Sequence, residues 1–334
     1  MTLRPIALAI AVMLVATAGV SPAASAASAA EAAFPVTIEH KFGSTTITEE
    51  PQRVLSLGYS DQDPILALGV VPIAVRYWYG DESDAVFPWA RDALGDDTSP
   101  EVLNMPEVNF ERIAALQPDV IIATYAGITA DEYDTLSQIA PTVAQSGEYI
   151  DYGMPWQEVT VAIGRALGRV ERAEELVAEV EAQFAAARDE HPEFAGLTLA
   201  AVGGEFEGRY GFFASADPRA RIFSSLGFQL PEEFDEIAGE QFYGDISAEQ
   251  LELFDRDVVV FQQIQFLENG LAGLKADPFV QQLDAVREGR VIYVDQELDD
   301  ALAFNSVLSL PFALEGLVPL LAAAADGDPA VVPS

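Results

Sequence analysis

The sequence contains no cysteine and only two histidines among its 334 residues. The absence of cysteine excludes disulfides, thiol catalysis and thiolate metal sites. It also excludes a lipid anchor on an N-terminal cysteine. The histidines, His40 and His191, are not spaced as ligands of one metal ion. The chain therefore offers few groups for nucleophilic or metal chemistry, and we predict no catalytic residue, no protein-held metal and no cofactor.

Basic residues are also scarce, with 17 lysines and arginines against 54 aspartates and glutamates and a formal net charge of −37. Such a surface repels nucleic acid and anionic lipid, so neither is expected as a partner. The acidity suits solubility in a salty or acidic exterior. A calcium store is the alternative, but the chain has no D-x-D-x-D-G loop to support it.

The first 29 residues have the pattern of a secretory signal peptide. A single Arg4 precedes an apolar run from Ile6 to Val20, and small residues follow, with cleavage expected near Ala26 or Ala29. The apolar run is too short for a transmembrane helix, and no later stretch is judged long and apolar enough. We therefore expect an exported monomer without direct membrane insertion.

Strand and helix patterns alternate along most of the remaining chain. A hairpin is predicted around Gly43, then strands and helices in turn up to residue 145, and a similar alternation begins again near residue 197. Alternation of this kind is typical of a parallel sheet with helices on its faces. The predicted fold class is α/β, with Rossmann-like lobes at residues 34–153 and 192–334.

Between the two lobes the pattern changes. Residues 154–191 keep apolar residues at three- and four-residue spacing without a strand. Residues 170–190 would form a helix about 30 Å long. We interpret this as a rigid linking segment with a ligand cleft between the lobes, and an ordinary packed helix is the alternative.

Two stretches, "NFERIAALQPDVIIA" at 109–123 and "SAEQLELFDRDVVVF" at 247–261, share one pattern. Glu111 precedes Asp119 by eight residues, and Glu249 precedes Asp257 by the same spacing. Apolar runs follow both aspartates. The same helix-to-strand unit is therefore expected once in each lobe.

Large amphipathic side chains gather where the predicted strands end, which is where ligands bind in open α/β sheets. The candidate ligand contacts at these strand ends are Tyr59, Arg76, Trp78, Tyr125, Arg209, Tyr210 and Tyr243, and Phe304 is added where a loop enters the last predicted helix. Arginine combined with aromatic rings suits a bulky ligand that is partly anionic and partly aromatic.

Enzyme motifs are missing by comparison. The chain has no G-x-S-x-G elbow, P-loop or G-x-G-x-x-G motif. The glycine-rich "VGGEFEGRYG" is interpreted as a turn. A secreted α/β hydrolase that uses a carboxylate pair stays open as an alternative.

Four stretches together resemble the substrate-binding proteins for ferric siderophores, vitamin B12 and haem that work with ATP-driven ABC importers. They are "PQRVLSLGYSDQDPILALG", "NFERIAALQPDVIIA", "ISAEQLELFDRDVVVF" and "LDAVREGRVIYVD". The resemblance covers about residues 35–325 and is closest to the ferric-siderophore branch. It implies two lobes joined by a long helix, and capture of an iron(III)–siderophore complex whose iron is held by the chelator.

The same resemblance leaves the ligand partly open, since vitamin B12 or haem could occupy this fold. Haem would need an axial ligand, and only tyrosines qualify here. The resemblance also implies that Glu111 and Glu249 dock onto arginines of the importer permease. Favourable placement at a helix N-terminus is the simpler explanation of either acid. Without an anchoring cysteine, the protein would be free in a periplasm-like space or retained there by another component.

Overall fold

The computed structural model describes residues 33–80, 83–95 and 99–327. The predicted signal peptide, residues 1–29, lies outside the described residues. The chain begins with an antiparallel hairpin of β1 (Val36–His40) and β2 (Gly43–Ile47), as the alternation around Gly43 predicted.

The N-terminal lobe is built on a five-stranded parallel sheet with strand order β5-β4-β3-β6-β7. The first strand of the chain within this sheet lies at its centre, which is the arrangement of a Rossmann-like half. Its elements are β3 (Val54–Ser56), α1 (Gln62–Ala67), β4 (Ala74–Arg76), η1 (Pro88–Ala90), α2 (Arg91–Leu94), β5 (Glu101–Leu103), α3 (Phe110–Leu116), β6 (Val120–Ala123), α4 (Ala130–Leu136) and β7 (Thr142–Ala144). All four residues of β6 are buried, as expected for a parallel strand covered on both faces.

The C-terminal lobe has a mixed five-stranded sheet of order β10-β9-β8-β11-β12. Strands β8, β11 and β12 are parallel, whereas β9 pairs antiparallel with both β8 and β10. Its elements are β8 (Leu199–Phe206), β9 (Arg209–Phe213), α7 (Pro218–Ser225), α8 (Glu232–Ala238), β10 (Tyr243–Ser247), η3 (Ala248–Phe254), β11 (Val258–Phe261), η4 (Ile264–Phe266), α9 (Gly270–Ala276), η5 (Val280–Gln282), α10 (Asp284–Arg287), β12 (Val291–Tyr293), α11 (Gln296–Phe304) and α12 (Ser309–Asp326). The glycine-rich stretch is therefore a hairpin, and only Glu207 and Gly208 form its turn.

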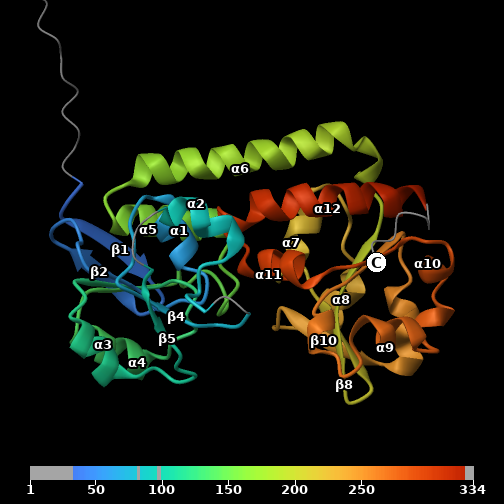
Figure 1. The fold of residues 1–334 in the computed structure, drawn as a ribbon, viewed down its shortest axis with the longest axis horizontal. Helices are drawn as coiled ribbons and strands as arrows, with labels where there is room; N and C mark the ends of the chain where they lie inside the picture. The colour runs from blue at the N-terminus through green and yellow to red at the C-terminus, as the bar shows by residue number, and fades with distance from the viewer. Residues whose placement is uncertain (1–32, 81–82, 96–98, 328–334) are drawn as a thin grey trace, which may run out of the picture. The chain divides into compact units, whose positions relative to one another are not determined.

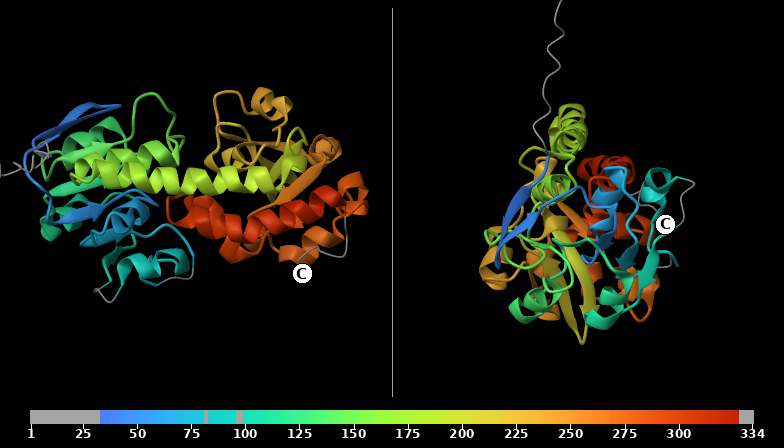
Figure 2. Two further views of the ribbon diagram at one scale, coloured as in Figure 1. Left: turned by 90° about the horizontal axis from the view of Figure 1, so that it is seen from above. Right: turned by 90° about the vertical axis from the view of Figure 1, so that its left-hand side faces the viewer.

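The two lobes are connected by α5 (Trp156–Ala166), α6 (Val170–Glu190) and the short η2 (Pro192–Phe194). Figure 1 shows α6 extending along both lobes, with α12 beside it. The view from above in Figure 2 shows the same two helices side by side. The predicted linking helix at residues 170–190 is thus present with those bounds, and it packs on α12 as well as on α5.

One hydrophobic core runs through both lobes. It includes Val120 of β6, Val180 of α6, Val258 of β11 and Leu317 of α12, all at most 3% exposed. Because one continuous core holds these elements, the connection between the lobes is a packed structure rather than an extended linker.

Helix α12 corrects one sequence expectation. It is long and apolar enough to span a membrane by length and composition, although no such stretch was expected after the signal peptide. Its residues Leu310, Leu314, Leu317 and Leu321 are nevertheless buried in the core. The packing identifies α12 as a core helix of the C-terminal lobe.

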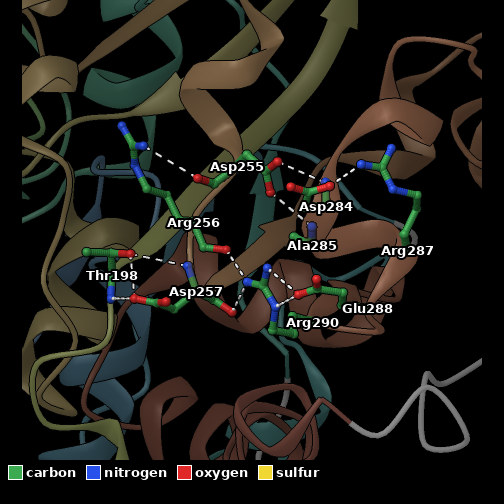
Figure 3. A network of polar contacts seen from close by, with 9 residues as sticks. All are labelled: Thr198, Asp255, Arg256, Asp257, Asp284, Ala285, Arg287, Glu288 and Arg290. Carbon is green, nitrogen blue, oxygen red and sulfur yellow. Dashed lines mark hydrogen bonds and ion pairs between the residues drawn. The ribbon is translucent and has the colours of Figure 1, made fainter.

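The repeated unit is present in both lobes, with α3 leading to β6 and the 3₁₀ helix η3 leading to β11. Asp119 accepts hydrogen bonds of 2.7 and 2.8 Å from the backbone N–H groups of Gln52 and Arg53. Asp257 accepts bonds of 2.8 and 2.7 Å from the backbone and hydroxyl of Thr198 (Figure 3). Each aspartate therefore fixes the chain entering the neighbouring strand, β3 or β8.

Candidate functional site

An aromatic pocket of about 290 Å³ is lined by residues of both lobes. Its lining residues are Tyr59, Trp78, Tyr125 and Tyr152 from the N-terminal lobe and Pro218, Arg219, Phe242 and Ala303 from the C-terminal lobe. Tyr59, Trp78 and Tyr125 follow the carboxyl ends of β3, β4 and β6, so the parallel sheet brings these three predicted residues together. We call this cavity the aromatic pocket.

The rings of the N-terminal lobe form a connected stack. Tyr59 stacks against Trp78 at 5.4 Å between ring centroids and against Tyr152 at 6.2 Å. Tyr125 meets Tyr152 edge-on at 5.2 Å. Contacts of this kind fix the orientation of each ring and stabilise it beyond simple area burial.

Tyr152 was missed by the sequence analysis, and its backbone conformation is unusual. Its φ of 64° lies in the left-handed region, which costs free energy for a residue with a side chain. The Tyr152 hydroxyl oxygen also lies only 2.2 Å from the position that a Cβ atom would take at residue 127, which is glycine. Gly127 has a φ of 60°, so this position requires glycine for both its backbone and its contact with Tyr152.

Arg76 does not line the aromatic pocket. It is the last residue of β4 and is 5% exposed, and its guanidinium donates to the carbonyls of Met105 and Pro106 at 3.3 and 2.8 Å. The guanidinium carbon lies 4.4 Å from the Tyr59 ring centroid. Arg76 therefore supports Tyr59 by a cation–π contact and has little surface available to a ligand.

Phe304 lies at the C-terminal end of α11, whereas the sequence analysis placed it where a loop enters the last helix. It is 2% exposed, and its ring contacts Phe87, Trp89 and Trp78 at 4.5, 5.3 and 5.5 Å. This side chain packs behind Trp78 and connects the two lobes through aromatic contacts.

Three further predicted contacts are not brought to the aromatic pocket. Arg209 is exposed and paired with Asp245, and the hydroxyl of the buried Tyr210 donates to Asp277. Tyr243 begins β10 and is 53% exposed. They were placed in loops after parallel strands, but β9 and β10 form an antiparallel pair, so the strand-end argument does not apply to them.

Arg219 is the cationic residue of the pocket lining, and the sequence analysis missed it. It follows Asp217 and Pro218 at the start of α7, and the Asp217 carboxylate accepts a bond of 2.8 Å from the Arg219 backbone N–H. An aspartate followed by proline is a strong helix-start pattern. That pattern was present in "ADPRARIFSS" and could have located the residue.

Two buried aspartates lie at the start of α1. Asp61 precedes α1 but does not cap it with its side chain, which instead accepts from the backbone and hydroxyl of Thr124 at 2.9 and 2.6 Å. Asp63 accepts from Trp89 Nε1 and Ser306 Oγ at 2.8 and 2.5 Å. Burial raises the pKa of each carboxyl group to about 6.

Glu111 and Glu249 occupy corresponding exposed positions in the first turns of α3 and η3. Helix α3 is capped by Asn109, whose side chain accepts from the Arg112 N–H at 2.9 Å, and not by Glu111. Ser247 and Gln250 form the cap of η3. Capping therefore does not require either glutamate.

Among the described residues, no group of three or more His, Cys, Asp and Glu side chains is arranged to hold a metal ion. His40 instead bonds Thr45 at 2.9 Å, and His191 bonds Glu193 at 2.9 Å.

Comparisons with known proteins agree with this geometry. Residues 54–298 match the family model described as periplasmic binding protein. The chain is 27% identical over 305 residues to the ferric-anguibactin-binding protein FatB of Vibrio anguillarum, which covers 85% of this chain and 87% of that protein.

Two solved structures are similar over 87% of this chain. A periplasmic solute binding protein from Mycobacterium smegmatis is 37% identical with a TM-score of 0.78, and 98% of it is covered. PiaA of Streptococcus pneumoniae in complex with ferrichrome is 28% identical with a TM-score of 0.75, and 99% of it is covered. The match overturns the hydrolase alternative, because these relatives are ligand-binding transport proteins. The chain belongs to the periplasmic binding protein family.

Proposed function

We propose that this protein captures a ferric siderophore in the aromatic pocket and delivers it to the permease of an ABC importer. The observation that carries this proposal is a pocket lined by aromatic rings from both lobes. Ligand pockets in proteins are mostly apolar with a few placed polar groups, and this composition suits the organic shell of an iron chelate. The iron would be cargo held by the chelator.

The relatives support the same ligand class. FatB is named for ferric anguibactin, and PiaA is described in complex with ferrichrome. Vitamin B12 and haem are the alternatives within this fold. Haem would need an axial ligand, which a tyrosine of the pocket such as Tyr125 would have to supply.

We propose that Glu111 and Glu249 dock the protein onto the permease, so that the ligand can be delivered. Both are exposed, both occupy the same position in a unit repeated once in each lobe, and neither is needed as a helix cap. Two anions held a fixed distance apart can match two cationic sites on a partner. Such matching fixes how the two proteins align and speeds their association. We place the protein outside the cytoplasm, in the cell envelope.

Fluorescence titration tests the ligand assignment. Trp78 lines the pocket, so a ferric siderophore should quench its emission with submicromolar affinity, about −8 kcal/mol or better. The control is Trp78→Phe, which keeps an aromatic ring and leaves Trp89 and Trp156 as emitters. Binding of vitamin B12 or haem, with no response to any ferric siderophore in a broad panel, would show that the proposed ligand class is wrong.

A further inference from the structure

The cation of the aromatic pocket already has an anionic partner. Arg219 donates from Nε and Nη2 to the two carboxylate oxygens of Asp217 at 2.9 and 2.8 Å. Bidentate pairs of this geometry are among the strongest charge-assisted hydrogen bonds in proteins. Asp217 has no exposed surface, so its carboxylate cannot turn to water when a ligand arrives.

The position of Arg219 is fixed from other sides as well. Its guanidinium carbon lies 3.7 Å from the Phe213 ring centroid, and its backbone N–H donates to Asp217 at 2.8 Å. Burial alone would lower the pKa of Arg219, but the carboxylate of Asp217 raises it above its ordinary value. The guanidinium is therefore charged and held, and an anionic ligand would compete with Asp217 for it.

The neighbouring arginines cannot replace Arg219 as ligand contacts. Arg76 is 5% exposed and bonded to backbone carbonyls. Arg221 donates to the carbonyls of Gly153 and Ala216 at 2.6 and 3.1 Å. Neither arginine lines the aromatic pocket.

The remaining walls disfavour negative charge. Tyr59, Trp78, Tyr125, Tyr152 and Phe242 present rings, and aromatic faces carry negative electrostatic potential. Such faces attract cations and tolerate uncharged groups. The whole chain also carries a net charge of −37, which repels an approaching polyanion.

We propose that the aromatic pocket selects ferric chelates without net negative charge, and that the Asp217–Arg219 pair sets this selectivity. The inference rests on the proposed function and narrows its ligand class. A ferric trihydroxamate meets the requirement, because three singly charged hydroxamates balance iron(III). A ferric tris-catecholate is a polyanion and does not. The sequence-based expectation of a partly anionic ligand relied on Arg76 and Arg209, which do not line the pocket.

The test compares chelates that differ in charge. Ferrioxamine B carries a pendant ammonium group, its N-acetyl derivative is neutral, and its N-succinyl derivative carries a pendant carboxylate. All three hold the iron in the same way. Ferrichrome serves as a second neutral probe, and ferric enterobactin and ferric citrate serve as anionic probes. Fluorescence titration at constant ionic strength should give weaker binding of the succinyl than of the acetyl derivative by about tenfold, with the anionic probes weaker than ferrichrome.

Variants of the pair test its role. Asp217→Asn keeps an oxygen that can cap α7 and leaves Arg219 without its anion, so the acetyl-to-succinyl affinity ratio should fall towards one or invert. The double variant Asp217→Asn, Arg219→Gln lacks both the carboxylate that repels an anion and the cation that would attract one, so its acetyl-to-succinyl affinity ratio should lie between those of the parent and of Asp217→Asn.

The outcomes separate the two proposals. Failure of every ferric chelate to bind would overturn the proposed function and this inference with it. Equal affinities across the charge series, or tighter binding of the anionic probes, would overturn the selectivity alone and leave the proposed function standing. If Asp217→Asn does not fold, the double variant decides: a ratio unchanged from the parent would show that the pair does not set the selectivity.

Discussion

Ser306 donates a hydrogen bond of 2.5 Å to the carboxylate of Asp63, a residue that lies 243 positions earlier in the chain. Asp63 belongs to α1 of the N-terminal lobe, and Ser306 lies between α11 and α12 of the C-terminal lobe. Trp89 Nε1 donates to the same oxygen, Oδ2. A single buried carboxylate oxygen thus connects the two lobes, and several of its physical consequences can be measured.

The first prediction concerns pH. The pKa of Asp63 is raised from 3.8 to about 6 by burial. Between these values the unfolded chain releases a proton that the folded state retains, so the contribution of Asp63 to the free energy of unfolding falls as pH rises from about 4 to 6. The loss is up to about 3 kcal/mol, and it stays constant above pH 6.

Asp63→Asn should remove this pH dependence. An asparagine can place its carbonyl where Oδ2 lies and keep both hydrogen bonds. Urea denaturation at several pH values should show the variant gaining stability relative to the parent as pH rises from 4 to 6. The control is Asp92→Asn, at an exposed position of α2. Parallel profiles for parent and Asp63→Asn would contradict the prediction.

The second prediction separates two arginines that looked alike in the sequence. Arg76→Ala should lower the free energy of unfolding by about 1–3 kcal/mol, because it leaves two carbonyls without their donor. The variant should also bind neutral and anionic chelates more weakly, and by the same factor, because Tyr59 loses its cation–π contact with Arg76. Arg209→Ala removes an exposed ion pair and should cost less than about 1 kcal/mol with no change in ligand affinity.

Urea denaturation and ligand titration of both variants provide the measurement. If Arg76→Ala lost affinity for anionic chelates but not for neutral ones, Arg76 would be a direct ligand contact after all.

The third prediction concerns Glu111 and Glu249. Alanine at either position should change stability by about 0.5 kcal/mol or less and leave ligand affinity unchanged, because both side chains are exposed. Uptake of labelled ferric siderophore by vesicles carrying the permease should fall, and it should fall further with arginine, because like charges would then face each other. Glu252→Ala, an exposed glutamate elsewhere in η3, is the matched control. Full transport by the double arginine variant would exclude a docking role.

The fourth prediction concerns the linking helix. Because α6 and α12 pack together within one core, the two lobes should keep their arrangement when ligand binds. Small-angle X-ray scattering should give nearly the same radius of gyration with and without ligand. A contraction of several ångströms would show that the lobes close as a hinge.

The sequence predicted the parts of the fold that depend on local patterns. The buried run at Val120–Ala123, the hairpin around Gly43 and the helix at 170–190 each follow from periodicity or turn chemistry, and the structure contains all three. The repeated unit was also visible, since Asp119 and Asp257 are held at equal spacing from Glu111 and Glu249.

Residues of the candidate site could be predicted only where the direction of the preceding strand could also be predicted. Tyr59, Trp78 and Tyr125 follow parallel strands, so their convergence could be inferred. Arg209 and Tyr210 were misplaced because the turn in "VGGEFEGRYG" was not extended into a hairpin, although a two-residue turn at Glu207 and Gly208 makes β9 antiparallel to β8. Arg219 was missed because its helix start was overlooked.

The continuous core has a consequence for how a bound ligand leaves. Separating the lobes would place in water side chains that pack across them, such as Phe304 against Phe87 and Trp89, at about 1.5–3 kcal/mol for each fully buried residue. Thermal motion alone seldom supplies the sum of several such terms. Under the proposed function, the work of opening the lobes would fall to the permease onto which Glu111 and Glu249 dock.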